Sequence, residues 1–133
     1  GRTRRSFLTN VPCTGNQPAM ISQGAQAEQL AVQYLQQQGL KLIVQNFRSR
    51  FGEIDLIMQD GTTVVFIEVR LRRNAGFGGA AASIGARKQQ RIISTAQQYL
   101  AGLARIPACR FDVVLLEDVE ERNIQWLKNA FDA

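Results

Sequence analysis

The chain has 133 residues, a formal net charge of +5 and no histidine. The lack of histidine excludes Ser-His and Cys-His nucleophiles and zinc sites that contain histidine. The two cysteines, Cys13 and Cys109, fit neither a metal-binding spacing nor a disulfide framework, and no apolar run is long enough to span a membrane. We therefore expect a cytoplasmic protein with a single core.

Residues 1–21 show no hydrophobic periodicity and are interrupted by prolines. The basic residues of this segment are Arg2, Arg4 and Arg5. We predict a flexible basic arm, for which a disordered chain end is a simpler explanation than a contact with nucleic acid. The rest of the chain, residues 22–133, is predicted to form one domain.

A helix is predicted from Ser22 to Gln38, with Ser22 as its N-cap and Gly39 closing its C-terminal end. The apolar stripe that supports this prediction consists of Ala27, Leu30, Ala31, Tyr34 and Leu35. Glu28 is the only acid in this helix and lies beside the stripe. It either points toward the sheet below or satisfies the positive end of the helix dipole.

Residues 41–47 are predicted to form a strand, and residues 52–73 a β-hairpin around Asp60-Gly61. With Asp60 and Gly61 as the two loop residues, alternation places four charged side chains on one face of the hairpin. They are Glu53, Asp55, Glu68 and Arg70. In this register Asp55 is diagonal to Glu68, about 7–8 Å away at the backbone, so the two carboxylates can meet on one ion.

Two carboxylates on a covered face need a partner, because a buried carboxylate must be paired, protonated or bound to a metal. Oxygen ligands without histidine or cysteine favour Mg²⁺ or Mn²⁺ over Zn²⁺. The alternative is a solvated face on which Glu53 and Glu68 pair with nearby arginines.

Basic residues are concentrated in the middle of the chain, and acidic residues follow Arg110. The basic set consists of Arg48, Arg50, Arg70, Arg72, Arg73, Arg87, Lys88 and Arg91. A basic face attracts polyanions, of which nucleic-acid backbones are the common cellular case. Solubility alone is the alternative explanation for this charge.

A glycine- and alanine-rich loop beside the site is predicted over residues 74–85, followed by a helix from Ala86 to Leu103. The first turns of this helix carry Arg87, Lys88 and Arg91, which have the wrong sign for the positive end of a helix dipole. Either a bound phosphate or acidic neighbours elsewhere in the fold must favour these cations.

The last predicted elements are strands, at Arg110–Leu116 with Asp112 inside it and at Asn123–Leu127. Trp126 is predicted to be a core or edge aromatic rather than a platform for stacking bases. The complete order, α-β-β-β-α-β-β, indicates a mixed α/β domain with one sheet between helices.

Several segments, taken in this order, resemble a known family. They are Gly24 with Ala27-Glu28, Gly52-Glu53-Ile54-Asp55-Leu56, Phe66-Ile67-Glu68-Val69-Arg70 and Arg110-Phe111-Asp112. These segments look like the uncharacterised bacterial YraN family, which is similar to archaeal Holliday-junction resolvases. The spacing from Asp55 to Glu68-Val69-Arg70 also resembles the metal-binding motif of the restriction-endonuclease-like, or PD-(D/E)xK, superfamily. The resemblance covers Gln23 to the C-terminus and implies a restriction-endonuclease-like fold, with a mixed sheet flanked by helices.

The resemblance implies that Asp55 and Glu68, with the backbone carbonyl of Val69, bind a catalytic Mg²⁺ or Mn²⁺ ion. Glu28 would take the helical carboxylate position, directly or through a water. Arg70 stands where the superfamily has lysine, and arginine stays protonated at any usable pH. Arg70 is therefore expected to stabilise charge or hold the scissile phosphate, and the nucleophile must come from metal-bound water.

Three functions follow as hypotheses. The first is a metal-dependent endonuclease acting on DNA, including branched or structured DNA, whose flanking backbone is held by Arg48, Arg50, Arg72, Arg73, Arg87, Lys88 and Arg91. The second is a nucleic-acid-binding module that keeps the fold without turnover, because the motif lysine is missing. The third is a structural or partner-binding domain. The residues do not indicate an oligomeric state.

Overall fold

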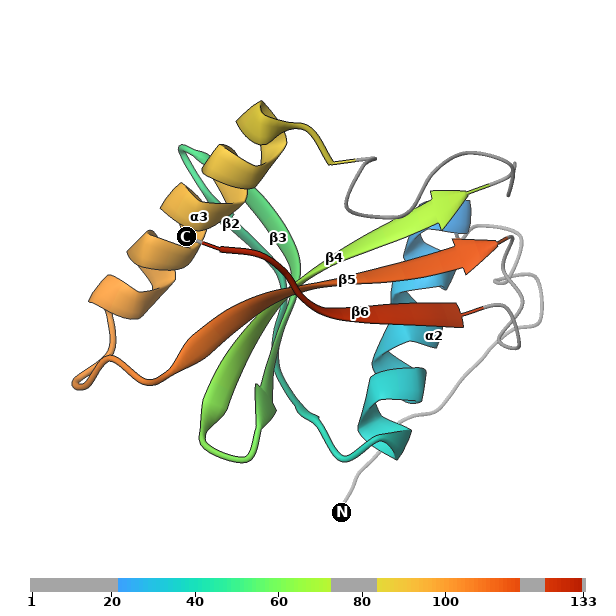
Figure 1. Ribbon diagram of the computed structural model, residues 1–133, viewed down its shortest axis with the longest axis horizontal. Coiled ribbons are helices and arrows are strands. Elements are labelled where there is room, and N and C mark those ends of the chain that lie inside the picture. Colours follow the sequence, from blue (N-terminus) through green and yellow to red (C-terminus); the bar gives the residue numbers. More distant parts are fainter. Residues whose placement is uncertain (1–21, 73–83, 118–123, 133) are drawn as a thin grey trace, which may run out of the picture.

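A computed structural model of the chain describes residues 22–72, 84–117 and 124–132 (Figure 1). Its elements are α2 (Gln23–Gln37), β2 (Lys41–Ser49), β3 (Gly52–Asp60), β4 (Thr63–Arg72), α3 (Ala86–Ala101), β5 (Cys109–Glu117) and β6 (Ile124–Phe131). This is the predicted order α-β-β-β-α-β-β. The predicted arm lies outside the described residues, as does the predicted 74–85 loop apart from its last two positions.

The strands form one five-stranded sheet in the order β2-β3-β4-β5-β6. The pair β4–β5 is parallel and is connected through α3, whereas the other three pairs are antiparallel. A parallel pair needs a long crossover, which α3 provides. The predicted mixed sheet is confirmed.

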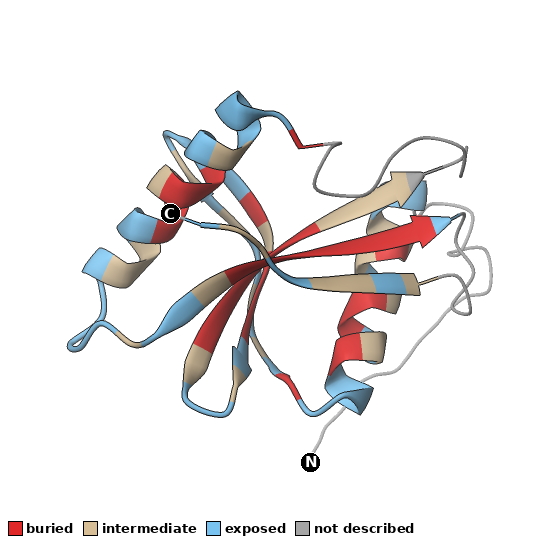
Figure 2. Cartoon of the chain, viewed as in Figure 1, coloured by how far each residue is buried: buried red, intermediate tan, exposed pale blue. Residues whose placement is uncertain are grey.

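The two helices cover opposite faces of this sheet (Figure 1). Along β3, Leu56 and Met58 pack in the cluster with α2, whereas Ile57 between them packs in the cluster with α3. Successive strand side chains point to opposite faces, so this alternation fixes a three-layer α/β/α arrangement. Figure 2 shows the buried residues along β5 and on the inner sides of both helices.

Helix α2 begins and ends as its sequence predicts. Ser22 is the N-cap, and its Oγ accepts a 3.1 Å hydrogen bond from the backbone N–H of Ala25. Gly39 follows the helix with φ of 101°, a conformation that glycine adopts without strain. Neither described helix is long and apolar enough to cross a membrane.

The predicted register of the β3–β4 hairpin is wrong by two residues. Asp60 pairs with Thr63, so the loop residues are Gly61 and Thr62 rather than Asp60 and Gly61. Of these two loop residues, only Gly61 has positive φ (63°), as a two-residue turn with glycine first requires. Asp60 stays in the strand, where its carboxylate accepts a 3.1 Å hydrogen bond from Nη2 of Arg110. A shift of two residues leaves the faces unchanged but moves Asp55 closer to Glu68 along the ladder.

Candidate active site

Asp55 lies where the ladder between β3 and β4 ends. The last paired residues are Leu56 and Ile67, and beyond them the backbone N–H of Val69 donates a 2.9 Å hydrogen bond to Oδ2 of Asp55. The two strands then diverge (Figure 1). The carboxylate of Asp55 thus lies against β4 at the point where the strands separate.

The alternation of side chains along β3 is broken between Ile54 and Leu56, on either side of Asp55. Ile54 and Ile57 belong to the same core cluster, although residues three apart on a regular strand point to opposite faces. On the neighbouring strand β2, Asn46 lies between the partners of Ile54 and Leu56 and has φ of 55°. This irregularity lets Asp55 turn toward the gap between the strands.

Glu68 is a buried carboxylate with two cationic neighbours. Its side chain is 5% exposed, and its Oε2 lies 3.3 Å from Nζ of Lys88 and 3.6 Å from Nη1 of Arg70. For Glu68 the alternative of a solvated, arginine-paired face is therefore wrong in the solvation and right in the arginine pairing, through Arg70. It holds for Glu53, which is exposed and accepts a 2.9 Å hydrogen bond from Nε of Arg48.

One cavity of about 340 Å³ brings together the residues predicted for catalysis and metal binding. Its lining consists of Gly24, Ala27, Glu28, Asp55, Glu68, Val69, Arg70 and Leu71. Residues from α2, β3 and β4 can reach the same space because the strands separate beyond Leu56 and Ile67. All four predicted catalytic residues thus line a single cavity.

The cavity disfavours negative charge. Burial, and then the negative charge of Glu68, raise the pKa of Asp55 from its usual 3.8 to about 7, although the Val69 N–H opposes this shift. Burial and then the charge of Asp55 also raise the pKa of Glu28, against a hydrogen bond from the Asn46 side chain. A cation placed between these acids would offset both the burial of the carboxylates and the repulsion between them.

Glu28 does not act through the helix dipole. The first turn of α2 contains no acidic residue, and the dipole effect falls off within that turn. Glu28 instead lines the cavity with Asp55, as the alternative prediction of a carboxylate pointing toward the sheet requires.

The donor set suits a hard divalent ion without forming a complete cage. Among the residues that the structure describes, no group of three or more His, Cys, Asp or Glu side chains is arranged to hold a metal. Mg²⁺ usually binds one or two protein carboxylates and keeps waters or substrate phosphates as its other ligands. Asp55 and Glu68 meet that requirement, and the Val69 carbonyl would add a third oxygen.

Lys88 belongs to this site, which sequence reasoning missed. It was assigned to the flanking nucleic-acid backbone, but its ammonium group pairs with Glu68. The sequence feature that indicates this contact is the group of cations in the first turn of the helix, because cations there are stabilised only by acidic neighbours or a bound anion. The acidic-neighbour alternative holds for Lys88.

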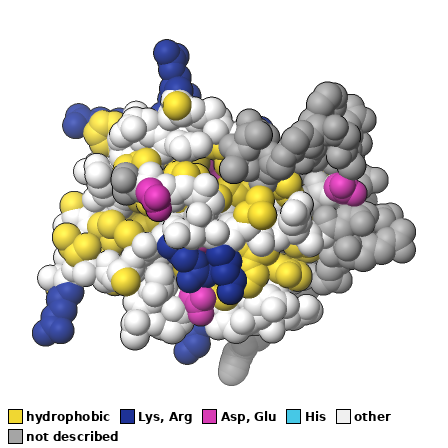
Figure 3. Space-filling model, viewed as in Figure 1, with side chains coloured by type: hydrophobic (Ala, Val, Ile, Leu, Met, Phe, Trp, Pro, Cys, Tyr) yellow, Lys and Arg dark blue, Asp and Glu magenta, His cyan; other side chains and the backbone are white. Residues whose placement is uncertain are grey.

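The other predicted phosphate contacts divide into three groups. Arg48, Arg50 and Arg91 line a second cavity, at the β2–β3 turn. Arg87 is exposed on α3. The Arg72 side chain and the whole of Arg73 lie outside the described part of the chain. On the face of the molecule in Figure 3, the described acidic side chains stand among the described basic ones, so these residues form no continuous basic patch there.

The family model described as "Uncharacterised protein family UPF0102" matches residues 27–116. The chain belongs to the UPF0102 family. UPF0102 is the YraN family that the sequence motifs predicted, so that prediction is confirmed. The matched region includes Glu28, Asp55, Glu68, Arg70 and Lys88.

Three UPF0102 relatives each match more than four fifths of the chain. The chain is 56% identical to a UPF0102 protein of Nitrosomonas europaea over 111 residues, covering 84% of this chain and 94% of the relative. It is 53% identical over 119 residues to one of Cupriavidus taiwanensis, covering 88% of each chain. A UPF0102 protein of Janthinobacterium sp. is 54% identical over 110 residues, covering 83% of this chain and 87% of the relative.

Proposed function

We propose that the chain is a divalent-metal-dependent endonuclease that cuts DNA, with branched or structured DNA as its substrate class. The observation that carries this proposal is the convergence of Asp55 and Glu68 in one cavity, where two cations, Arg70 and Lys88, pair with Glu68. Such a site suits phosphodiester hydrolysis, because the two acids can hold a metal ion and the two cations can hold the anionic substrate.

Asp55 and Glu68 would hold the Mg²⁺ or Mn²⁺ ion, helped by the Val69 carbonyl and by Glu28 at the α2 side of the cavity. The bound ion would supply an activated water and neutralise charge on the phosphoryl oxygens. The N–H of Val69 orients the Asp55 carboxylate by direct hydrogen bonding. This contact keeps the carboxylate in place whether or not it carries a proton.

Arg70 and Lys88 would bind the scissile phosphate. Arg70 cannot accept a proton at any usable pH, so its role is restricted to holding phosphate and stabilising charge in the transition state. Lys88 supplies an amine 3.3 Å from Oε2 of Glu68, from α3 rather than from β4. Without substrate both cations neutralise Glu68, and a divalent ion at the acid pair would release them toward the phosphate.

A second candidate is a DNA-binding module without turnover. It is favoured by the ion pairs of Glu68, which already satisfy that carboxylate, and by the lack of a three-acid cluster among the described residues. Such a module would bind DNA in a salt-dependent manner and release no product with either ion.

The deciding experiment measures cleavage of labelled duplex, single-stranded and branched DNA with Mg²⁺ or Mn²⁺. We expect the wild type to produce metal-dependent fragments and Asp55→Asn to lose at least about 100-fold in rate, a typical loss for a catalytic group. Glu117→Gln is the matched control, because it removes an exposed carboxylate outside the cavity. Equal cleavage by wild type and Asp55→Asn rejects the endonuclease proposal, and binding without any cleavage supports the second candidate.

A further inference from the structure

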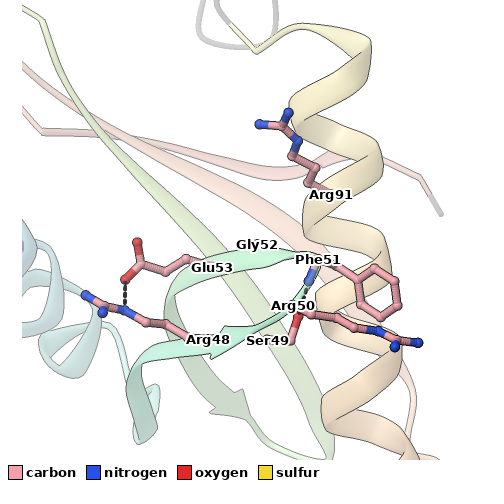
Figure 4. A pocket seen from close by; sticks show the side chains of 7 residues that line it. All are labelled: Arg48, Ser49, Arg50, Phe51, Gly52, Glu53 and Arg91. Carbon is pink, nitrogen blue, oxygen red and sulfur yellow. Dashed lines mark hydrogen bonds and ion pairs between the residues drawn. The ribbon is translucent and has the colours of Figure 1, made fainter.

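A second cavity of about 470 Å³ lies where the β2–β3 turn meets α3 (Figure 4). Its lining consists of Arg48, Ser49, Arg50, Phe51, Gly52, Glu53 and Arg91. Only Arg91 comes from the helix, and the other residues are consecutive in the chain. None of them lines the cavity that contains Asp55 and Glu68.

This turn cavity has a surplus of positive charge. The guanidinium of Arg48 is neutralised by Glu53 at 2.9 Å. Within the described segments of the chain, no carboxylate pairs with Arg50 or Arg91, and both side chains are exposed. Two unneutralised guanidinium groups around an open cavity favour an anionic ligand, and their planar donors suit phosphate.

The same cavity presents an aromatic surface. Phe51 is 38% exposed, and Cζ of Arg50 lies 5.0 Å from the centroid of its ring. Unpaired nucleobases stack on aromatic rings and on guanidinium planes, whereas the bases of an intact duplex are stacked on one another. A phosphate-binding surface that includes an exposed ring is therefore better suited to a single strand than to a duplex.

Hydrogen bonds fix the turn against α3. The N–H of Phe51 donates to Oγ of Ser49 (3.0 Å), which donates to Oγ1 of Thr95 (3.3 Å). Thr95 in turn donates to the carbonyl of Arg91 (2.8 Å). Glycine is favoured at position 52 because its φ is 154°, a backbone conformation that residues with a side chain rarely adopt. A surface held in this way loses little freedom when it binds a ligand.

The turn cavity lies close to the candidate active site along one strand. Gly52 in the turn cavity and Asp55 in the active-site cavity are both in β3. At about 3.3 Å per residue, they are roughly 10 Å apart. Because the turn cavity is lined from α3 and the active-site cavity from α2, a nucleic-acid strand that reaches both would have to pass the end of the β3–β4 ladder.

We propose that the β2–β3 turn is a subsite for a single-stranded segment of the nucleic-acid substrate. An unpaired base stacks on the Arg50–Phe51 pair, and its flanking phosphates bind Arg50 and Arg91. This subsite rests on the proposed nuclease function for its biological role. It deepens that function by naming the substrate class as DNA with unpaired nucleotides next to the cut.

The test measures binding of a short fluorescent oligothymidine and of a blunt duplex to the full chain, in the presence of a chelator of divalent ions. We expect Phe51→Ala to weaken oligothymidine binding roughly 5- to 100-fold, the range for one lost base stack, and to leave duplex affinity within about 2-fold. Phe51→Tyr retains a ring and should restore the affinity. Ile106→Ala is the matched control, because Ile106 is 75% exposed and lies outside both cavities.

A salt titration tests the phosphate contact. Arg91→Gln should reduce the slope of log affinity against log salt by about 0.7 for the single strand, the value for one lost phosphate contact. Arg105→Gln, an exposed arginine outside both cavities, should leave that slope unchanged.

Three results would overturn the subsite. They are no oligothymidine binding by the wild type, no effect of Phe51→Ala, and equal losses for single strand and duplex. Because binding is measured without divalent ions, it is independent of cleavage. If cleavage depends on Asp55 but Phe51→Ala does not change oligothymidine binding, the subsite alone is rejected. If binding depends on Phe51 but no cleavage occurs, only the endonuclease is rejected.

Discussion

The backbone N–H of Val69 donates a 2.9 Å hydrogen bond to Oδ2 of Asp55, across the end of the β3–β4 ladder. Val69 directly follows Glu68, so this bond sets the position of one carboxylate relative to the strand that carries the other. The acid pair is thus aligned by the backbone, and an amide oxygen at position 55 can keep the same bond. This makes Asp55→Asn a substitution that removes charge without removing the alignment.

Asp55→Asn should abolish divalent-ion binding and stabilise the ion-free protein. At pH about 8 the wild type holds a buried carboxylate beside Glu68, and the amide removes both the desolvation cost and the repulsion. We expect the free energy of unfolding to rise by about 1–3 kcal/mol, measured by urea denaturation with a chelator present. Calorimetric titration with Mn²⁺ should show binding to the wild type only. A destabilised variant, or one that still binds Mn²⁺, contradicts this prediction.

The stability of the ion-free protein should fall as the pH rises toward 7. The pKa of Asp55 is raised from 3.8 to about 7 in the folded state, so between these values the folded chain holds a proton that the unfolded chain has released. Stability then decreases with pH through this window and levels off above about pH 7. Urea denaturation of wild type and Asp55→Asn should show a stability gap that grows over the same range. A gap that does not change with pH would show that Asp55 titrates normally.

Lys88→Gln separates metal binding from catalysis. Loss of the ammonium group 3.3 Å from Glu68 removes a cation that competes for this carboxylate, so Mn²⁺ affinity should rise. Cleavage should fall at least about 10-fold, because the variant lacks a group that holds the substrate phosphate. Since Lys88 is 45% exposed, the cost in stability should not exceed about 1 kcal/mol.

The control for Lys88 is its neighbour in sequence. Arg87 is exposed and, unlike Lys88, is not among the described ion-pair partners of Glu68, so Arg87→Gln should leave Mn²⁺ affinity unchanged and reduce cleavage by less than about 3-fold. Similar effects of the two substitutions would mean that Lys88 contributes only general positive charge. Arg70→Lys is a further variant, and we expect it to retain cleavage because a cation beside Glu68 is kept.

Periodicity and capping predicted most of the fold. The stripe and the Ser22 cap of α2 depend on contacts within a few residues, and those are visible in the sequence. Strand ends were less accurate: β6 extends to Phe131, whereas the prediction ended at Leu127. Lys128 and Asn129 interrupt the apolar pattern there, and the strand continues past them because Phe131 pairs with Phe111 of β5, a contact distant in sequence.

The acid pair was predicted from alternation, but its geometry was not. Moving the loop by one residue shifts the hairpin register by two, which preserves the faces and changes the distance between Asp55 and Glu68. The break in alternation at Asp55 lies opposite the irregularity at Asn46 on β2, and the ion pair between Lys88 and Glu68 depends on the packing of α3 on the sheet. Both are tertiary effects that a local pattern does not contain.

Asp112 is a buried acid that stabilises the fold and does not line the active-site cavity. It is 0% exposed on β5, and both of its oxygens accept hydrogen bonds from Nε of Arg110 (3.1 and 3.2 Å). It also accepts from Nε1 of Trp126 (2.9 Å) and from the N–H of Asn129 (2.9 Å). Asn129 has φ of 54° and lies where the β5–β6 register shifts. Asp112 therefore stabilises the irregular part of the edge strand β6.

Asp112→Asn should destabilise the protein strongly and leave the acid pair intact. Every described partner of Asp112 is a donor, so the amide nitrogen of asparagine would face a donor whichever way it turns. We expect a loss of about 3–5 kcal/mol in the free energy of unfolding, the usual cost of breaking a buried ion pair. Trp126→Phe removes one hydrogen bond and should cost about 1–2 kcal/mol. Mn²⁺ affinity of the folded fraction should match the wild type, because Asp112 does not line either cavity; weaker binding would place it in the site.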